Sequence, residues 1–150
     1  MPKLHERTGP FWDAVAGRIP VPPAAASLGL EVIEADPENG TIELAFEATH
    51  GFTTPRGDVL EGFLAAMLHE TVGPAVLATL EPDQFIVTLD LKSTFLQPVY
   101  PGRVIGMGRV VHRDADIAFA EGELFDSEGR LVATGASTIR IVAFPGASER

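Results

Sequence analysis

Two adjacent ionisable residues, His69 and Glu70, lie within the most apolar long stretch of the chain, residues 60–79. A carboxylate inside such a stretch is unfavourable unless it is paired or used, so Glu70 is the first candidate for chemistry. A carboxylate in this setting either attacks a carbonyl group or activates a water molecule against it. The alternative for Glu70 is a contact with an arginine or with the backbone of a partner. His69 is a second base, a substrate contact or an interface residue.

Gly62 stands eight residues before Glu70, near the expected start of a helix. An amide N–H in the first turn has no partner within the helix and is reinforced by the helix dipole, so it could polarise a carbonyl oxygen. At 1.5 Å of rise per residue the two positions lie about 12 Å apart. A single chain therefore cannot easily supply both groups to one carbonyl.

Several other chemistries are excluded by residue content. The chain has no cysteine, which rules out disulfides, thiolate zinc sites and a cysteine nucleophile, and which fits a reducing compartment. No Gly-x-Ser-x-Gly elbow of a serine hydrolase is present. No metal site is expected either, because metal-ligand spacing is absent among the four histidines, His5, His50, His69 and His112.

The overall charge and hydropathy also narrow the partners. A net charge of -10, with 11 scattered basic residues, argues against nucleic acid as a partner, although a few local donors can still bind a small anionic molecule. No stretch approaches the roughly 18 apolar residues of a membrane span, and the charged N-terminus lacks the apolar run of a signal peptide. We therefore expect a cytoplasmic protein that has no membrane partner.

The elements that must position these residues begin with one long helix over residues 60–79, apolar on nearly all sides and so wrapped by other elements. Pro74 lacks an N–H, which should bend this helix, either beside a site or simply along a sheet.

A short helix is expected over residues 8–17, followed by an ordered linker over residues 18–23, where three prolines stand. We expect a single domain over residues 1–150, whose N-terminal helix and proline-rich lead-in occupy about residues 1–27.

Apolar residues at alternate positions predict strands over residues 41–47 and 85–96, and turn residues delimit further strands along the chain. These strands are expected over residues 28–34, 41–47, 85–96, 103–111, 117–125 and 131–143. Turns are expected at residues 36–40, 113–116 and 126–129, and a loop at residues 49–58. Three glycines within expected strands are interpreted as bends or close-packing points: Gly102, Gly106 and Gly108.

Successive strands with short turns predict an antiparallel meander, so the fold class is α+β, a curved antiparallel sheet wrapped around one long central helix. One sheet covers only one side of such a helix. The other side, and the edges of the sheet, need a partner subunit. We therefore expect a homodimer or a dimer of dimers.

The segment 57–71, GDVLEGFLAAMLHET, resembles the hotdog-fold acyl-CoA thioesterases. It is most similar to the phenylacetate-degradation (PaaI-like) and 4-hydroxybenzoyl-CoA thioesterase branch, in which a loop Asn and a Gly precede His-Gly-Gly and an acid follows within the helix. The resemblance extends over residues 28–142, including FLQPVYPG at 95–102 and DSEGRLVA at 126–133. It implies the hotdog fold and a site shared across a dimer, which agrees with the separation of Gly62 and Glu70.

This chain departs from the family motif, and two alignments remain open. The first places the family Gly-Gly on Glu61 and Gly62. It then places the loop Asn on Thr54, the His on Leu60 and the acid on His69.

The second alignment is shifted by one residue. It places the family His on Glu61, the first Gly on Gly62 and the acid on Glu70, and it keeps the threonine that usually follows the acid, here Thr71. Neither alignment leaves His-Gly-Gly intact.

The resemblance implies hydrolysis of a small or aromatic acyl-CoA to the free acid and CoA, with coenzyme A as part of the substrate and no separate cofactor. Glu70 would act as base or nucleophile, Gly62 as the oxyanion donor and His69 as a further catalytic residue. Expected substrate contacts are Thr54, Glu61, Phe63 and Thr71.

Two other functions remain open. The changes at Thr54, at Leu60 or Glu61, and at Phe63 favour a protein that binds or senses acyl-CoA without turnover. A hotdog dehydratase or hydratase is the third hypothesis, but the differently arranged His and carboxylate of those enzymes are not found.

Overall fold

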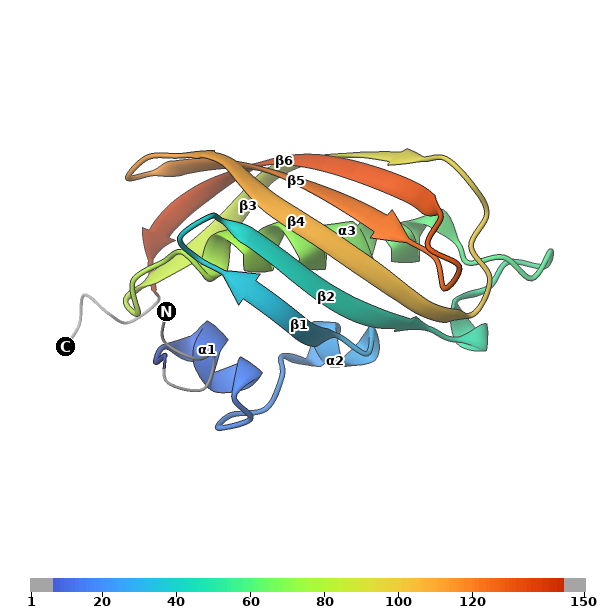
Figure 1. Ribbon diagram of the computed structural model, residues 1–150, viewed down its shortest axis with the longest axis horizontal. Coiled ribbons are helices and arrows are strands. Elements are labelled where there is room, and N and C mark those ends of the chain that lie inside the picture. Colours follow the sequence, from blue (N-terminus) through green and yellow to red (C-terminus); the bar gives the residue numbers. More distant parts are fainter. Residues whose placement is uncertain (1–6, 145–150) are drawn as a thin grey trace.

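The computed structural model describes residues 7–144, in which six strands wrap around one long helix (Figure 1). The helices are α1 (Pro10–Val15), α2 (Pro23–Ser27), the 3-10 turn η2 (His50–Phe52) and α3 (Glu61–Leu77). The strands are β1 (Glu31–Asp36), β2 (Thr41–Ala48), β3 (Gln84–Phe95), β4 (Gly102–Arg113), β5 (Ile117–Phe125) and β6 (Leu131–Ala143). The first six residues of the expected lead-in lie outside the described range. No helix within residues 7–144 is long and apolar enough to cross a membrane.

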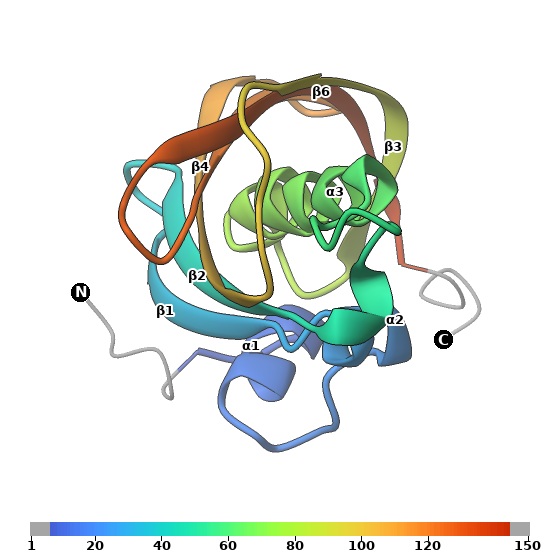
Figure 2. The same cartoon turned by 90° about the vertical axis from the view of Figure 1, so that its right-hand side faces the viewer.

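The sheet has the order β1-β2-β4-β5-β6-β3, and every neighbouring pair is antiparallel. The predicted curved sheet around one central helix is therefore confirmed. The predicted meander is confirmed for β4, β5 and β6 but is wrong for β3, which pairs with β6 at the far edge. Residues 96–101 make this possible, since they carry the chain across the open end of the sheet in place of a tight turn (yellow in Figure 2).

The N-terminal part differs from expectation at two places. The predicted strand over 28–34 is wrong in its first three residues, because Leu28 is the C-cap of α2 and Gly29 turns the chain at a φ of 66°. The helix α2 was not predicted; it begins with Pro23, a residue that is well suited to the first position of a helix. The expected short helix is confirmed as α1, which lies beside α2 and β1 (Figures 1 and 2).

Close packing between α3 and the sheet depends on glycines in β4 and β5. A methyl group added at Gly106 would lie 2.5 Å from the hydroxyl of Thr71, and one added at Gly108 would lie 2.8 Å from the carbonyl oxygen of Thr71. Gly122 on β5 faces the same turn of the helix. The interpretation of Gly106 and Gly108 as close-packing points is confirmed, and these glycines fix how deeply α3 sits in the sheet.

The substitution Gly108→Ala is expected to destabilise the fold by about 1–3 kcal/mol, because the backbone of α3 must move to admit the new methyl group. Urea unfolding at one fixed protein concentration would measure the loss as a lower midpoint. Gly51→Ala is the matched control, since its nearest new contact is an ordinary 3.5 Å to the Thr49 hydroxyl. Equal midpoints for Gly108→Ala and the wild type would contradict this account of the packing.

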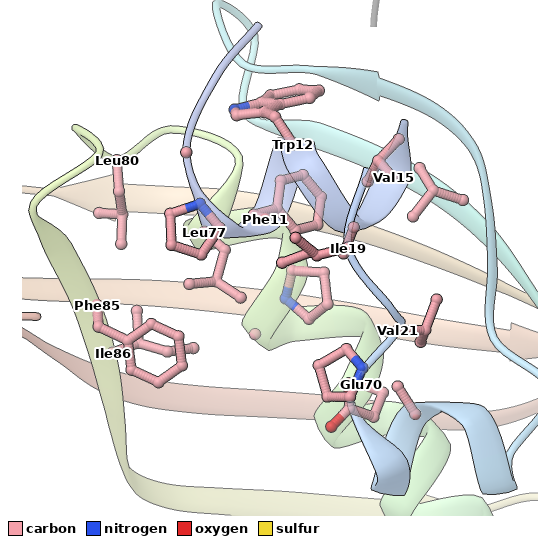
Figure 3. A pocket seen from close by; sticks show the side chains of 18 of the residues that line it. Phe11, Trp12, Val15, Ile19, Val21, Glu70, Leu77, Leu80, Phe85 and Ile86 are labelled. Carbon is pink, nitrogen blue, oxygen red and sulfur yellow. The ribbon is translucent and has the colours of Figure 1, made fainter. Parts of the chain in front are cut away.

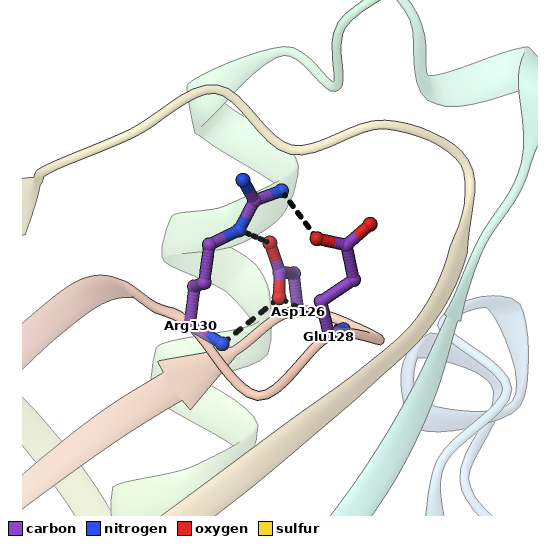
Figure 4. A network of polar contacts seen from close by, with 3 residues as sticks. All are labelled: Asp126, Glu128 and Arg130. Carbon is purple, nitrogen blue, oxygen red and sulfur yellow. Dashed lines mark hydrogen bonds and ion pairs between the residues drawn. The ribbon is translucent and has the colours of Figure 1, made fainter.

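The predicted turn at residues 126–129 is confirmed and is held by an aspartate. The Asp126 carboxylate accepts hydrogen bonds from the amides of Glu128 and Arg130, each at 3.0 Å. The Arg130 side chain returns to Asp126 at 2.9 Å and to Glu128 at 3.5 Å (Figure 4). The turn therefore fixes the register between β5 and β6. Strand β6 in turn pairs with β3 on its other side.

Edge strand β3 turns apolar side chains outward. The alternating residues that predicted this strand include Val87 and Leu89, yet these two are 47% and 49% exposed, whereas Ile86 faces the helix side. The pairing with β6 shifts register between Thr88 and Asp90, so the strand bulges beside Leu89. The sheet thus ends in an edge that is both apolar and unpaired within the described chain.

Candidate active site

The N-terminus of α3 leaves the amide of Gly62 available to a ligand. The N-cap residue is Leu60, whose side chain accepts no hydrogen bond, and Gly62 stands in the first turn. A methyl group at Gly62 would meet no atom within 4 Å, so the space beside this residue is open. The N-terminus is fixed in place by the Leu60 amide, which donates to Phe52 at 2.9 Å, and by the Val59 amide, which donates to Val99 at 2.7 Å.

Two of the predicted substrate contacts help to build the loop that precedes α3. The Thr54 hydroxyl donates to the buried carboxylate of Asp58, and this hydrogen bond lowers the pKa of Asp58. Phe63 stacks on Phe52, with ring centroids 4.1 Å apart and planes 7° from parallel. Substrate contacts by Thr54, Phe63 and the exposed Glu61 stay predictions. The hydrogen bond and the ring stacking hold the loop in place before α3.

His69, Glu70 and Thr88 form a small polar cluster on the face of α3 that points toward β3. The Nδ1 atom of His69 lies 3.6 Å from a carboxylate oxygen of Glu70, and Nε2 lies 3.1 Å from the hydroxyl of Thr88. If Thr88 donates to Nε2, the ring proton stands on Nδ1 and faces the carboxylate. Glu70 is only 26% exposed, so water reaches it from a limited direction.

The protonation of His69 depends on this cluster. Hydrogen bonding to the Glu70 carboxylate raises the pKa of His69 above its ordinary value of 6.5, against the opposing effect of burial. The charge of the carboxylate adds to the increase. The cationic form of His69 is therefore favoured next to Glu70 at a higher pH than in an isolated histidine.

A cavity of about 800 Å³ begins at this cluster. His69, Glu70 and Thr88 belong to its wall, and the rest of the wall is mainly apolar (Figure 3). Apolar side chains from α1, α3 and β3 line it: Phe11, Trp12, Val15, Leu77, Phe85 and Ile86. Figure 3 shows Glu70 in the same cavity as these side chains. A carboxylate at the wall of an apolar cavity is a typical arrangement for acid–base or nucleophilic chemistry.

The structure brings together His69 and Glu70 but separates them from two other predicted residues. Gly62 stands two turns earlier on α3 and does not line the cavity. Thr71 is fully buried against β4 and β5, and its hydroxyl donates to the Met67 carbonyl at 2.7 Å. The structure therefore gives Thr71 a packing role in place of the substrate contact expected from the sequence.

Thr88 was not predicted as a site residue. A threonine in a strand carries no signal of its own, and its partner His69 is distant in sequence. Only the position of β3 next to α3 brings the two together. The bulge that follows Thr88 offered no sequence signal either.

Comparisons with known proteins assign the chain to a family. The thioesterase superfamily matches residues 56–133. A solved thioesterase candidate from Ralstonia eutropha, described as related to phenylacetic acid degradation, is 36% identical to this chain; the match covers 87% of this chain and 98% of that one, with a TM-score of 0.84.

Two further relatives agree in fold or sequence. The Escherichia coli PaaI protein from the phenylacetic acid degradation operon is 16% identical and has a TM-score of 0.78, over 89% of this chain and 94% of that one. An esterase candidate from Saccharolobus solfataricus is 27% identical over 69% of this chain and 72% of its own length. With its sheet wrapped around α3 and its match over residues 56–133, the chain belongs to the thioesterase superfamily and has the hotdog fold.

Proposed function

We propose that the protein is an acyl-CoA thioesterase that hydrolyses a small or aromatic acyl-CoA to the free acid and CoA. Membership of the thioesterase superfamily supports thioester hydrolysis in general. The observation that carries the proposal is the position of Glu70, whose carboxylate stands at the wall of an apolar cavity and beside His69. Coenzyme A enters as part of the substrate, and no separate cofactor is needed.

Glu70 would perform the chemistry in one of two ways. As a base it removes a proton from water while the water oxygen bonds to the carbonyl carbon. As a nucleophile it bonds to that carbon itself, and water then cleaves the resulting anhydride, which releases the acid and restores the carboxylate. In both routes the C–S bond breaks, the sulfur of CoA leaves and takes up a proton, and water supplies the oxygen of the acid. His69, held by Thr88, would keep the carboxylate in position.

The carbonyl oxygen becomes negative during this reaction and needs a donor. The free first-turn amide of Gly62 is suited to that role, because the helix dipole reinforces it. Gly62 lies two turns from Glu70 on the same helix and outside the cavity wall. The donor for a given Glu70 would therefore come from the Gly62 of a second copy.

A second candidate function, acyl-CoA binding without turnover, is favoured by one observation. The Thr54 hydroxyl, which in the first alignment takes the place of the family's loop Asn, is already bonded to Asp58. The Thr54 hydroxyl would then not be available to donate a hydrogen bond to the substrate carbonyl.

The two functions are separated by one experiment. Free thiol release is measured for a panel of aliphatic and aromatic acyl-CoAs, and the affinity for each acyl-CoA is measured by calorimetry on the same preparation. Turnover of at least one acyl-CoA supports the thioesterase. Binding without any thiol release supports the binding protein, and the absence of both contradicts the two proposals together.

We expect the protein to form a homodimer or a dimer of dimers through edge strand β3. An unpaired strand edge with exposed apolar side chains favours pairing with another chain. Light scattering should give a particle of at least twice the 16.0 kDa of one chain. A stable single-chain particle at micromolar concentration would refute this expectation.

The edge that pairs is tested by Leu89→Lys, which should produce single chains and, if the site is shared, should also abolish thiol release. Ile33→Lys is the control, because Ile33 is 39% exposed on β1, the opposite edge strand. Dissociation by Ile33→Lys but not by Leu89→Lys would place the interface on the other edge.

A further inference from the structure

The cavity beside Glu70 is built largely by the N-terminal segment. Phe11, Val15 and Val21 line the cavity together with residues of α3 and β3 (Figure 3). This segment is fixed to the fold by Trp12, which is only 4% exposed and belongs to the hydrophobic core, and the ion pair between Asp13 and Arg18 at 2.8 Å holds the segment together internally. Residues 8–22 therefore supply one wall of the cavity.

His69 and Thr88 stand beside Glu70 in the cavity wall, and two of the other polar side chains there, Gln84 and Glu31, already have partners. Gln84 accepts from the amide of Glu81 at 3.1 Å and from Arg113 at 3.3 Å. Glu31 lies 3.7 Å from Arg103 on β4. The cavity thus has the Glu70 carboxylate at one place and a mainly apolar lining elsewhere, which is suited to an apolar group without polar substituents.

The size of the cavity exceeds what a short acyl group fills. A methylene group takes up about as much space as a water molecule, roughly 30 Å³ in the liquid, so a propionyl group would fill only about one tenth of 800 Å³. Cavities of roughly 300–1,000 Å³ commonly bury most of a ligand the size of a drug. The available space favours an acyl group several times larger than propionyl.

We infer that this cavity is the acyl site, that it takes an unsubstituted apolar acyl group of octanoyl size or larger, and that residues 8–22 set this preference. The inference rests on the proposed thioesterase function; it keeps an acyl-CoA as the substrate but replaces the small acyl group proposed above with a larger apolar one. The thioester carbonyl lies at Glu70, and the tail extends between α1 and the first residues of β3, against Leu77, Phe85 and Ile86. CoA remains outside the cavity.

The test compares butyryl-, octanoyl- and dodecanoyl-CoA. In the wild type, kcat/KM should rise roughly two- to fourfold for each added methylene up to octanoyl, the gain expected when each methylene leaves water. Val21→Trp fills part of the cavity and should lower kcat/KM for dodecanoyl-CoA at least about tenfold, and for butyryl-CoA by a clearly smaller factor. Val111→Trp is the matched control, because Val111 is 48% exposed on β4 and does not line the cavity.

A second readout separates this inference from the proposed activity. Calorimetry with the thioether analogue of dodecanoyl-CoA, which cannot be hydrolysed, should show at least about tenfold weaker binding to Val21→Trp than to Val111→Trp. If no thioester is hydrolysed but this difference is found, the acyl site stands and the thioesterase proposal fails. If hydrolysis occurs with equal kcat/KM for butyryl- and dodecanoyl-CoA, and Val21→Trp resembles Val111→Trp, the thioesterase stands and the acyl site is overturned.

Discussion

Glu70→Gln is expected to lower kcat for acyl-CoA hydrolysis at least about 100-fold, the lower range for the loss of a general base. Glutamine keeps the size of the side chain at the cavity wall but can neither accept the proton of water nor attack the carbonyl. His69→Ala should reduce kcat less, because His69 acts on Glu70 and is itself more exposed. If His69→Ala is the more damaging change, the first alignment is right and His69 takes the place of the family's acid.

An independent measurement shows whether Glu70→Gln alters the cluster or the whole fold. The carboxylate raises the pKa of His69, so an NMR titration should give a lower His69 pKa in Glu70→Gln than in the wild type. The raised pKa also links His69 to stability: its contribution is full below about 6.5 and is lost as the pH rises through the higher pKa of the folded state. If the His69 pKa is the same in Glu70→Gln and in the wild type, the side chains of His69 and Glu70 do not interact in solution.

Gly62→Pro is expected to lower kcat by roughly 100-fold or more, the usual loss when one oxyanion donor is removed. Proline has no N–H, and the first turn of a helix tolerates it better than any later turn. Because the donor acts mainly on the developing negative charge, binding of a thioether analogue should change far less than turnover. Stopped-flow thiol release and calorimetry on one preparation would measure both effects.

The control for Gly62→Pro is Gly62→Ala, which keeps the N–H and places its methyl group where no atom lies within 4 Å. Alanine should lose much less activity than proline. Circular dichroism must accompany both, because proline disfavours the helical conformation of the residue before it. Equal losses in the two variants, with both folded, would exclude the Gly62 amide as the donor.

The sequence predicts well those elements whose signal is local. The helix α3 was expected over residues 60–79 and spans Glu61–Leu77, continuing through Pro74. The strand β5 was predicted at its observed bounds, since the turn residues at 113–116 and 126–129 delimit it on both sides. The helix α2 was missed, because five residues that follow a proline-rich linker carry almost no periodic signal.

Features that depend on distant parts of the chain could not be predicted. Apolar residues at alternate positions identified β3 as a strand, but they indicated neither its partner β6 nor that Val87 and Leu89 face outward. The cavity escaped prediction for the same reason, since its walls come from α1, α3 and β3. For Thr71 the family resemblance suggested a substrate contact, whereas the glycines of β4 place this side chain against the sheet.

The place of β3 in the sheet has a consequence for how the chain is synthesised. Gln84 pairs with Ala143, about 60 residues later, so β3 has no partner until β6 has left the ribosome. At roughly 5–20 residues per second, the apolar helix α3 and the edge of β3 wait about 3 to 12 s for the strand that covers them. Contacts this distant in sequence also slow folding after release. Nascent chains stalled before β6 would therefore expose their most aggregation-prone surfaces, and these chains are the natural targets of chaperones.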